Sequence, residues 1–163
     1  MANPWNVLFL CTGNSARSIL AEAILNHKGQ GRFRAYSAGS HPTGQPRSEA
    51  LNELESAGIS TVGLRSKSWD EFSGTNAPEL HFVFTVCDNA AHEPCPHWPG
   101  QPTTAHWGIA DPAAVKGSPE EIARAFREAF TILNRRIGLL LSLPLATLDA
   151  MAIKAELQKI GRA

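Results

Sequence analysis

The sequence predicts a single α/β domain spanning residues 1–163, in which a four-stranded parallel sheet carries helices on both faces. Three observations support this fold class. Short apolar, β-prone stretches alternate with longer amphipathic stretches, which is typical of strands connected by helices. The length suits one domain with a substantial core, and neither an internal repeat nor a low-complexity linker divides the chain.

Two strands and two helices are expected in the first half of the chain. The apolar run at residues 6–10 predicts a buried strand, and the apolar face of residues 17–27 predicts a helix. Alternation over residues 33–37 predicts a second strand. A second helix is expected over residues 47–57, with Gly58 at its C-terminal end.

Two further strands are expected in the second half. Residues 81–86 are almost continuously apolar or β-prone, as in a strand covered on both faces, and residues 103–107 predict the fourth strand. Between them, residues 89–101 are rich in Pro, His and Gly, which predicts an irregular or weakly helical segment.

The last long helix has a well-defined expected start. Ser118 is a suitable N-cap, Pro119 suits the first helical position, and Glu121 completes a capping box. An apolar stripe then continues until Pro144, which cannot extend a helix. The tail after Pro144 yields no structural prediction.

Composition excludes several classes of partner. The chain has 15 basic and 15 acidic residues, so no field of one sign attracts nucleic acid or anionic lipid. No apolar stretch is long enough to span a membrane, and no signal peptide is visible. Three cysteines without a secretion signal favour a reducing compartment and reactive thiols. We expect a cytoplasmic monomer.

The expected site begins at the end of the first strand, where Cys11 precedes a Gly/Asn/Ser turn and a helix N-terminus. Backbone N–H groups of such a loop converge on one point, where the helix dipole adds positive charge. The expected oxyanion-binding residues are Thr12, Gly13, Asn14, Ser15, Ala16, Arg17 and Ser18. Arg17 supplies a planar fork for two oxygens, and the same groups are expected to lower the pKa of Cys11. The alternative is an inert buried cysteine beside a surface arginine.

Further candidate residues follow the third and fourth strands. Asp111 precedes a proline and, with Cys11 and Arg17, suits phosphoester hydrolysis as the general acid, although Asp-Pro is also a common turn pair. Cys87 and Cys95 are two more thiols. With His92 and His97 they raise the alternative of a zinc site, but the spacing matches no common ligand pair, so we expect no metal.

The Cys-x5-Arg-Ser pattern at residues 11–18 resembles the signature of low-molecular-weight protein tyrosine phosphatases and of the arsenate reductases that share their fold. The phosphatases usually carry a second cysteine in the loop, where this chain has Ala16, and an aromatic residue after Asp-Pro, where it has Ala113. Residues 85–96 and 106–112 are instead similar to three-cysteine arsenate reductases. The resemblance implies a low-molecular-weight phosphatase-like fold.

The resemblance also implies a reaction. Cys11 attacks arsenate, and Asp111 assists departure of water. Cys87 then attacks Cys11 and forms a disulfide with it. Finally, Cys95 attacks Cys87, which frees Cys11 and leaves a Cys87–Cys95 disulfide. No bound cofactor is expected. An external thiol system, thioredoxin or glutaredoxin with glutathione, would reduce the last disulfide, and phosphate or sulfate would act as substrate analogues.

Pairing Cys87 with Cys95 predicts a mobile, redox-switched segment over residues 87–98, since eight helical residues would hold the two thiols too far apart. The alternative functions are a tyrosine phosphatase that uses Cys11, Arg17 and Asp111, and a thiol sensor without turnover.

A cation site is a further implication of the resemblance. Some relatives bind potassium through positions that match Asn14, Glu22, Ser37 and an aspartate, and this chain has Lys67 at the last position. The Lys67 ammonium would replace or repel a cation, so we expect no potassium dependence.

Overall fold

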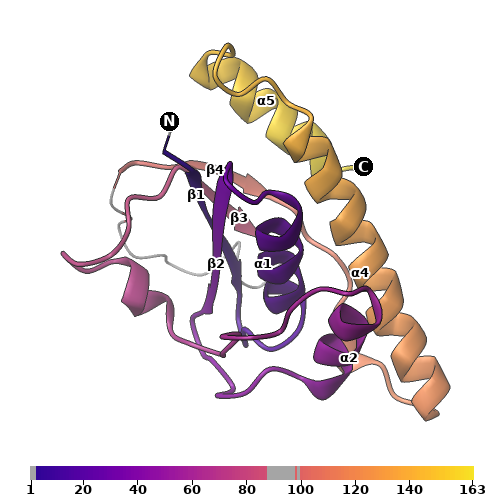
Figure 1. Ribbon diagram of the computed structural model, residues 1–163. Helices are drawn as coiled ribbons and strands as arrows, with labels where there is room; N and C mark the ends of the chain where they lie inside the picture. The colour runs from indigo at the N-terminus through magenta and orange to yellow at the C-terminus, as the bar shows by residue number, and fades with distance from the viewer. Residues whose placement is uncertain (1–2, 88–97, 99) are drawn as a thin grey trace.

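The computed structural model describes residues 3–87, 98 and 100–163 (Figure 1). In chain order the elements are β1 (Trp5–Cys11), α1 (Arg17–Lys28), β2 (Phe33–Gly39), α2 (Ser48–Ser56), the 3-10 helix η1 (Trp69–Phe72), β3 (Phe82–Thr85), β4 (Thr103–His106), the 3-10 helix η2 (Pro112–Ala114), α4 (Pro119–Leu141) and α5 (Ala150–Ile160). Helices separate β1 from β2 and β2 from β3, as expected.

All four strands are parallel, in the order β2-β1-β3-β4, which confirms the predicted sheet. The register pairs Leu10 with Thr85 and Thr85 with His106, so β1, β3 and β4 end at the same edge. Strand β2 is added on one side of β1. Strand β3 is then added on the other side of β1, and β4 lies beyond β3. Ligands of such sheets bind beside the carboxyl ends of the strands, at the point where the strand order reverses.

The two faces of the sheet are covered differently. On β1, Val7 and Phe9 belong to the larger apolar core, whereas Leu8 and Leu10 face a smaller core on the opposite side. Figure 1 shows the described α-helices on one side of the sheet and η1 on the other. Phe72 of η1 belongs to the smaller core. Both faces are therefore covered, one of them by a single 3-10 turn and loops within the described residues.

Helix α4 begins as predicted. The Ser118 side chain accepts a hydrogen bond from the backbone N–H of Glu121, the Glu121 side chain reaches back to the N-cap, and Pro119 occupies the first turn. The helix ends at Leu141, three residues before Pro144. Among the described helices, none combines the length and the apolar character required to cross a membrane.

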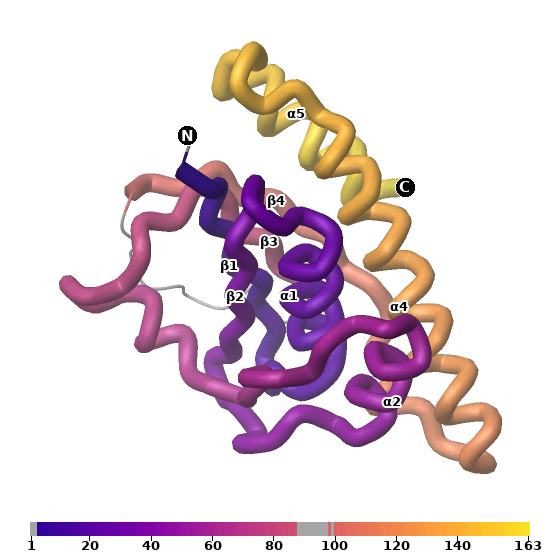
Figure 2. The backbone as a smooth tube through the Cα atoms, viewed as in Figure 1, coloured from indigo at the N-terminus to yellow at the C-terminus, as the bar shows by residue number. Residues whose placement is uncertain are grey.

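Helix α5 was not predicted, although Ile153, Leu157 and Ile160 recur at the spacing of one helical face and Asp149 caps its start. Tertiary contacts hold it in place: the Trp107 indole N–H donates to the Leu157 carbonyl at 2.9 Å. At Gly161 a Cβ would lie 2.3 Å from the His106 carbonyl oxygen, so only glycine allows this approach to the end of β4. Figure 2 shows the last residues of the chain returning to lie beside α4.

Candidate active site

The predicted site residues of the first, third and fourth strands meet in one pocket. Its volume is about 350 Å³, and it opens at the carboxyl ends of the strands. The residues that line it are Cys11, Thr12, Gly13, Ser15, Ala16, Arg17, Thr43, Arg47, Cys87, Asp111 and Ala113. Five of the seven predicted oxyanion-binding residues therefore line the pocket, and the other two, Asn14 and Ser18, lie buried behind it.

The start of α1 leaves backbone donors unpaired by any cap. Ala16 at the N-cap position has no side-chain acceptor, and no acidic residue occupies the first turn. Because the first N–H groups of a helix have no intrahelical partner, they and the helix dipole favour an anion at this end. The loop before α1 therefore has the electrostatic character that the sequence predicted.

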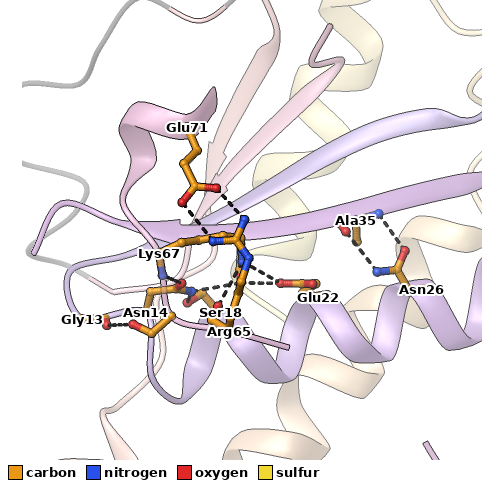
Figure 3. Close-up of polar contacts among 11 residues, drawn as sticks. Gly13, Asn14, Ser18, Glu22, Asn26, Ala35, Arg65, Lys67 and Glu71 are labelled. Carbon is orange, nitrogen blue, oxygen red and sulfur yellow. Dashed lines mark hydrogen bonds and ion pairs between the residues drawn. The ribbon is translucent and has the colours of Figure 1, made fainter. Parts of the chain in front are cut away.

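The loop turns through Asn14, whose φ of 47° lies in the left-handed region that asparagine tolerates better than most residues. The Asn14 amide is fully buried and donates to the hydroxyls of Ser18 and Ser37, at 2.8 and 2.9 Å (Figure 3). Its oxygen accepts from the backbone N–H of Lys67 at 2.9 Å. Ser18, which the sequence analysis placed among the oxyanion-binding residues, accepts this bond from Asn14 and supports the loop from behind.

Lys67 also forms a buried ion pair beneath the loop. Its Nζ lies 3.6 Å from Oε1 of Glu22, and the two side chains are only 6% and 13% exposed (Figure 3). Burial raises the pKa of Glu22 and lowers that of Lys67, and in each case the opposite charge of the partner acts against the shift. The ammonium thus lies beside Glu22, as expected from the resemblance. The absence of potassium dependence stays a prediction.

Arg17 is held at the pocket by the loop that follows β4. Its Nη1 donates to the Ile109 carbonyl at 2.9 Å, and its Nη2 lies 3.5 Å from Oδ2 of Asp111. Its Nε is buried and has no hydrogen-bond partner among the described residues. An unpaired guanidinium N–H is costly to bury, and an oxyanion in the pocket would supply the missing acceptor.

The Cys11 and Cys87 thiols form a hydrogen-bonded pair, and both are reduced. The backbone N–H of Thr12 donates to Sγ of Cys87 at 3.3 Å, which holds the second thiol against the loop. Two sulfur atoms from the ends of β1 and β3 are thus placed for exchange with each other. Both cysteines belong to the larger apolar core, so they lie on the same side of the sheet.

The expected lowering of the Cys11 pKa was wrong. The pKa of this thiol is raised, first because Cys87 is hydrogen-bonded to it and second because it is buried. Arg17 and the Gly13 backbone N–H lower it, as predicted, but these effects are smaller. The sequence analysis expected Cys87 to react with Cys11 but did not consider its effect on the Cys11 pKa, and two adjacent thiols resist carrying two negative charges.

Asp111 caps a turn and also lies in the pocket. Its Oδ1 accepts from the Ala113 N–H at 3.0 Å and so caps η2, while Oδ2 faces Arg17. The side chain is 40% exposed and lines the pocket. A carboxyl group at this place reaches an oxygen that leaves from a substrate bound by the loop, which suits a general acid.

Arg47 is a pocket residue that the sequence analysis treated only as a helix start. Its backbone N–H donates to the Ser15 carbonyl at 2.8 Å, and its guanidinium pairs with Glu49 at 2.8 Å. This pairing lowers the pKa of Glu49 to about 2. A second guanidinium therefore lies at the rim. One sequence feature could have identified Arg47 as a pocket residue: it follows the Gly/Pro-rich loop after β2, the strand next to β1.

Part of the predicted site lies outside the described residues. This applies to Cys95, His92 and His97, so the Cys87–Cys95 disulfide, the mobile segment and the zinc alternative stay untested there. Within residues 3–87, 98 and 100–163, no three His, Cys, Asp or Glu side chains gather at distances suited to a metal ion.

A parallel α/β domain with a cysteine loop, a helix N-terminus and an arginine at the carboxyl edge defines a cysteine-containing oxyanion-binding protein. The family model described as low molecular weight phosphotyrosine protein phosphatase matches residues 6–158. The chain belongs to this family, and the low-molecular-weight phosphatase-like fold expected from the sequence is confirmed.

Similar proteins of known name include arsenate reductases. The chain is 35% identical over 131 residues to the arsenate reductase of Bacillus subtilis (strain 168), covering 80% of this chain and 91% of that protein. It is 32% identical over 133 residues to the arsenate reductase of Shouchella clausii (strain KSM-K16), with the same coverage of 80% and 91%.

Solved structures with a similar fold include an arsenate reductase and a phosphatase. The structure described as an arsenate reductase in the phosphate binding state has a TM-score of 0.69 and 25% identity, and the match covers 85% of this chain and 97% of that one. A low molecular weight protein tyrosine phosphatase from T. tengcongensis has a TM-score of 0.64 at 24% identity, covering 84% and 97%, and shows the fold alone.

Proposed function

We propose that this protein reduces arsenate to arsenite, with Cys11 as the first nucleophile and Cys87 as the second. The observation that carries the proposal is the contact between these two thiols at the floor of an oxyanion pocket. A phosphoester hydrolase requires only the first thiol. Two thiols in contact supply the two electrons that arsenic(V) must gain.

The first step joins Cys11 to arsenic. Arsenate binds with its oxygens toward Arg17 and the loop N–H groups, and the Cys11 sulfur attacks arsenic. A sulfur–arsenic bond forms as one oxygen leaves. The leaving group is a hydroxyl of arsenate, which takes up the Cys11 thiol proton, transferred by Asp111, and departs as water.

The second step transfers the electrons. The Cys87 sulfur attacks Cys11, a sulfur–sulfur bond forms, and the sulfur–arsenic bond breaks with its electron pair left on arsenic. Arsenic(V) becomes arsenic(III), the Cys87 proton passes to arsenite, and a Cys11–Cys87 disulfide remains. The Thr12 N–H bonded to Cys87 favours this thiol as the attacking sulfur.

The third step restores Cys11. Cys95 attacks Cys87, and the resulting Cys87–Cys95 disulfide is reduced by an external dithiol, for which thioredoxin and glutaredoxin with glutathione are the candidates. The support for this step is the resemblance to three-cysteine arsenate reductases and the presence of exactly one remaining thiol in the chain.

The second candidate function is hydrolysis of a phosphate monoester by Cys11, Arg17 and Asp111, which the family match favours. The pocket argues against an aryl ester, because none of its described lining residues is aromatic and the rim carries Arg47. A free tetrahedral oxyanion needs no stacking surface for a phenyl ring, whereas a tyrosyl ester gains affinity from one.

Single-turnover chemistry tests the proposal without knowledge of the reductant. Fully reduced protein is mixed with arsenate, and arsenite release and thiol loss are measured. We expect one arsenite and two lost thiols per chain. Cys87→Ser should release none, whereas Cys95→Ser, the matched control, should still complete this turnover and fail only in repeated cycles.

Other outcomes select the alternatives. Hydrolysis of an aryl phosphate that requires Cys11 but not Cys87, with no arsenite from the wild type, would establish the phosphatase instead. Neither activity in reduced, folded protein would favour a thiol sensor.

A further inference from the structure

The segment that carries Asp111 is held by two arginines on successive backbone carbonyls. After β4, the carbonyls of Trp107 and Gly108 accept hydrogen bonds from Arg136, and the next carbonyl, that of Ile109, accepts from Arg17. Three consecutive acceptors are therefore paired with guanidinium groups, one from α4 and one from α1. This segment ends at Asp111, two residues beyond Ile109.

Arg136 is buried, with 7% of its surface exposed. Its Nη1 lies 2.8 Å from the Trp107 carbonyl oxygen and 3.3 Å from that of Gly108, and its Nε donates to the Ala163 carbonyl at 3.3 Å. Burial lowers its pKa, and the hydrogen bonds described above all go to backbone oxygen atoms rather than to a carboxylate side chain. Burying a cation costs free energy unless hydrogen bonds compensate for the lost water. The groups that Arg136 hydrogen-bonds therefore indicate what it stabilises.

The two anchors differ in their relation to the pocket. Arg17 lines the pocket, and its hydrogen bond to Ile109 and its ion pair with Asp111 compete with any oxyanion that binds its guanidinium. Arg136 does not line the pocket, so an oxyanion bound there does not compete for its hydrogen bonds. During turnover, Arg136 is therefore the anchor that does not exchange partners.

We infer that Arg136 is a positioning residue for the Asp111 acid, acting through the backbone of residues 107–111. The inference rests on the proposed function, because it assigns Arg136 to the step in which Asp111 assists the leaving oxygen. Misplacement of a catalytic group by about 1 Å costs about 100-fold in rate. Loss of Arg136 should thus lower the rate of arsenite release far more than it lowers oxyanion affinity.

A double-mutant cycle in the single-turnover assay tests this. We expect Arg136→Met to slow arsenite release by about 10- to 100-fold, with arsenate affinity changed less than about 3-fold. In an Asp111→Asn background the same substitution should cost less than about 2-fold, because the group that it positions is already gone. Arg136→Lys should recover part of the rate and serves as the variant of choice if Arg136→Met does not fold. Arg135→Met, at an exposed neighbouring position on α4, is the matched control and should leave the rate unchanged.

Amide hydrogen exchange gives a second readout that needs no activity. The Ala113 N–H is bonded to the Asp111 carboxylate, so its exchange should accelerate about 10-fold in the Arg136 variants while the Phe9 amide in β1 keeps its wild-type rate. Equal acceleration at Ala113 and Phe9, or equal rate losses in both backgrounds of the cycle, would overturn the inference and leave a structural role only. If the wild type releases no arsenite, the proposed function fails, and exchange at Ala113 alone decides the positioning role.

Discussion

The buried pair of Lys67 and Glu22 makes a quantitative prediction about the support of the oxyanion loop. Lys67→Met keeps most of the side-chain volume and removes the positive charge, which leaves the Glu22 carboxylate buried without its cation. Both side chains are largely excluded from solvent, and the pair is 3.6 Å apart. Through Asn14 the same segment holds the left-handed turn of the loop.

The expected loss of stability is large. Removing one partner of a buried ion pair costs about 3–5 kcal/mol, since the remaining charge has been desolvated without compensation. The free energy of unfolding of a typical domain is about 5–15 kcal/mol, so the variant should still fold but unfold at a clearly lower urea concentration. Removing both charges in Lys67→Met/Glu22→Gln should recover part of the loss.

The loss should also depend on pH. The Glu22 pKa in the folded protein is already above its usual value, and Lys67 is what holds it down. Without Lys67 it rises further. A carboxyl group whose folded pKa exceeds its unfolded pKa stabilises the fold most at acidic pH, and this contribution disappears as pH rises through the folded value. The stability gap between wild type and Lys67→Met should therefore be small near pH 5 and widen toward pH 8.

Urea unfolding at the two pH values, followed by circular dichroism, measures this gap. Arg65→Met is the matched control, because Arg65 forms an exposed pair with Glu71 on the same segment and such pairs contribute about 0–1 kcal/mol. A loss below about 1 kcal/mol for Lys67→Met, or a gap that does not change with pH, would refute the reasoning.

Three further predictions follow from the site and from α4. Cys87→Ala should lower the pKa of Cys11, because the hydrogen bond that raises it most is removed, and iodoacetamide should then alkylate Cys11 about 10-fold faster at pH 7, as one pKa unit implies. Unchanged alkylation would contradict this. Arsenite release should be equal in potassium and in tetramethylammonium buffers, because an ammonium already lies beside Glu22; activation by potassium would show the opposite. Ser118→Ala should lower the unfolding free energy by about 1 kcal/mol through loss of the N-cap, with a fall in thermal midpoint as the measure and no change as the contrary result.

Local patterns predicted much of the fold. The capping box at Ser118 and the turn after Cys11 depend on neighbours within a few residues, and both are present. Helix α5 was missed although its sequence carries apolar residues at helical spacing, at Ile153, Leu157 and Ile160. Its place beside β4 depends on distant contacts, namely the Trp107 indole and the close approach of Gly161 to β4.

The site was predicted in its components and corrected in its electrostatics. Cys11, Arg17, Cys87 and Asp111 meet in one pocket as expected, since the carboxyl ends of parallel strands share an edge. The raised pKa of Cys11 was not foreseen, because the distance between two thiols 76 residues apart depends on strand register and loop path. Arg47 was missed as a pocket residue because the path of the loop after β2 decides whether its side chain reaches the site.

The sequence by itself determined the kind of chemistry: a thiol before a turn, a helix N-terminus and an arginine six residues later form an anion site through bonded neighbours alone. Only the tertiary structure decided which charged and ionisable groups lie close enough to act on that site. The contact of Cys87 with Cys11, the Lys67–Glu22 pair and the hold of Arg136 on residues 107–108 join segments that the chain separates widely. Electrostatic energies depend on distance and burial, and these quantities exist only once the elements have packed.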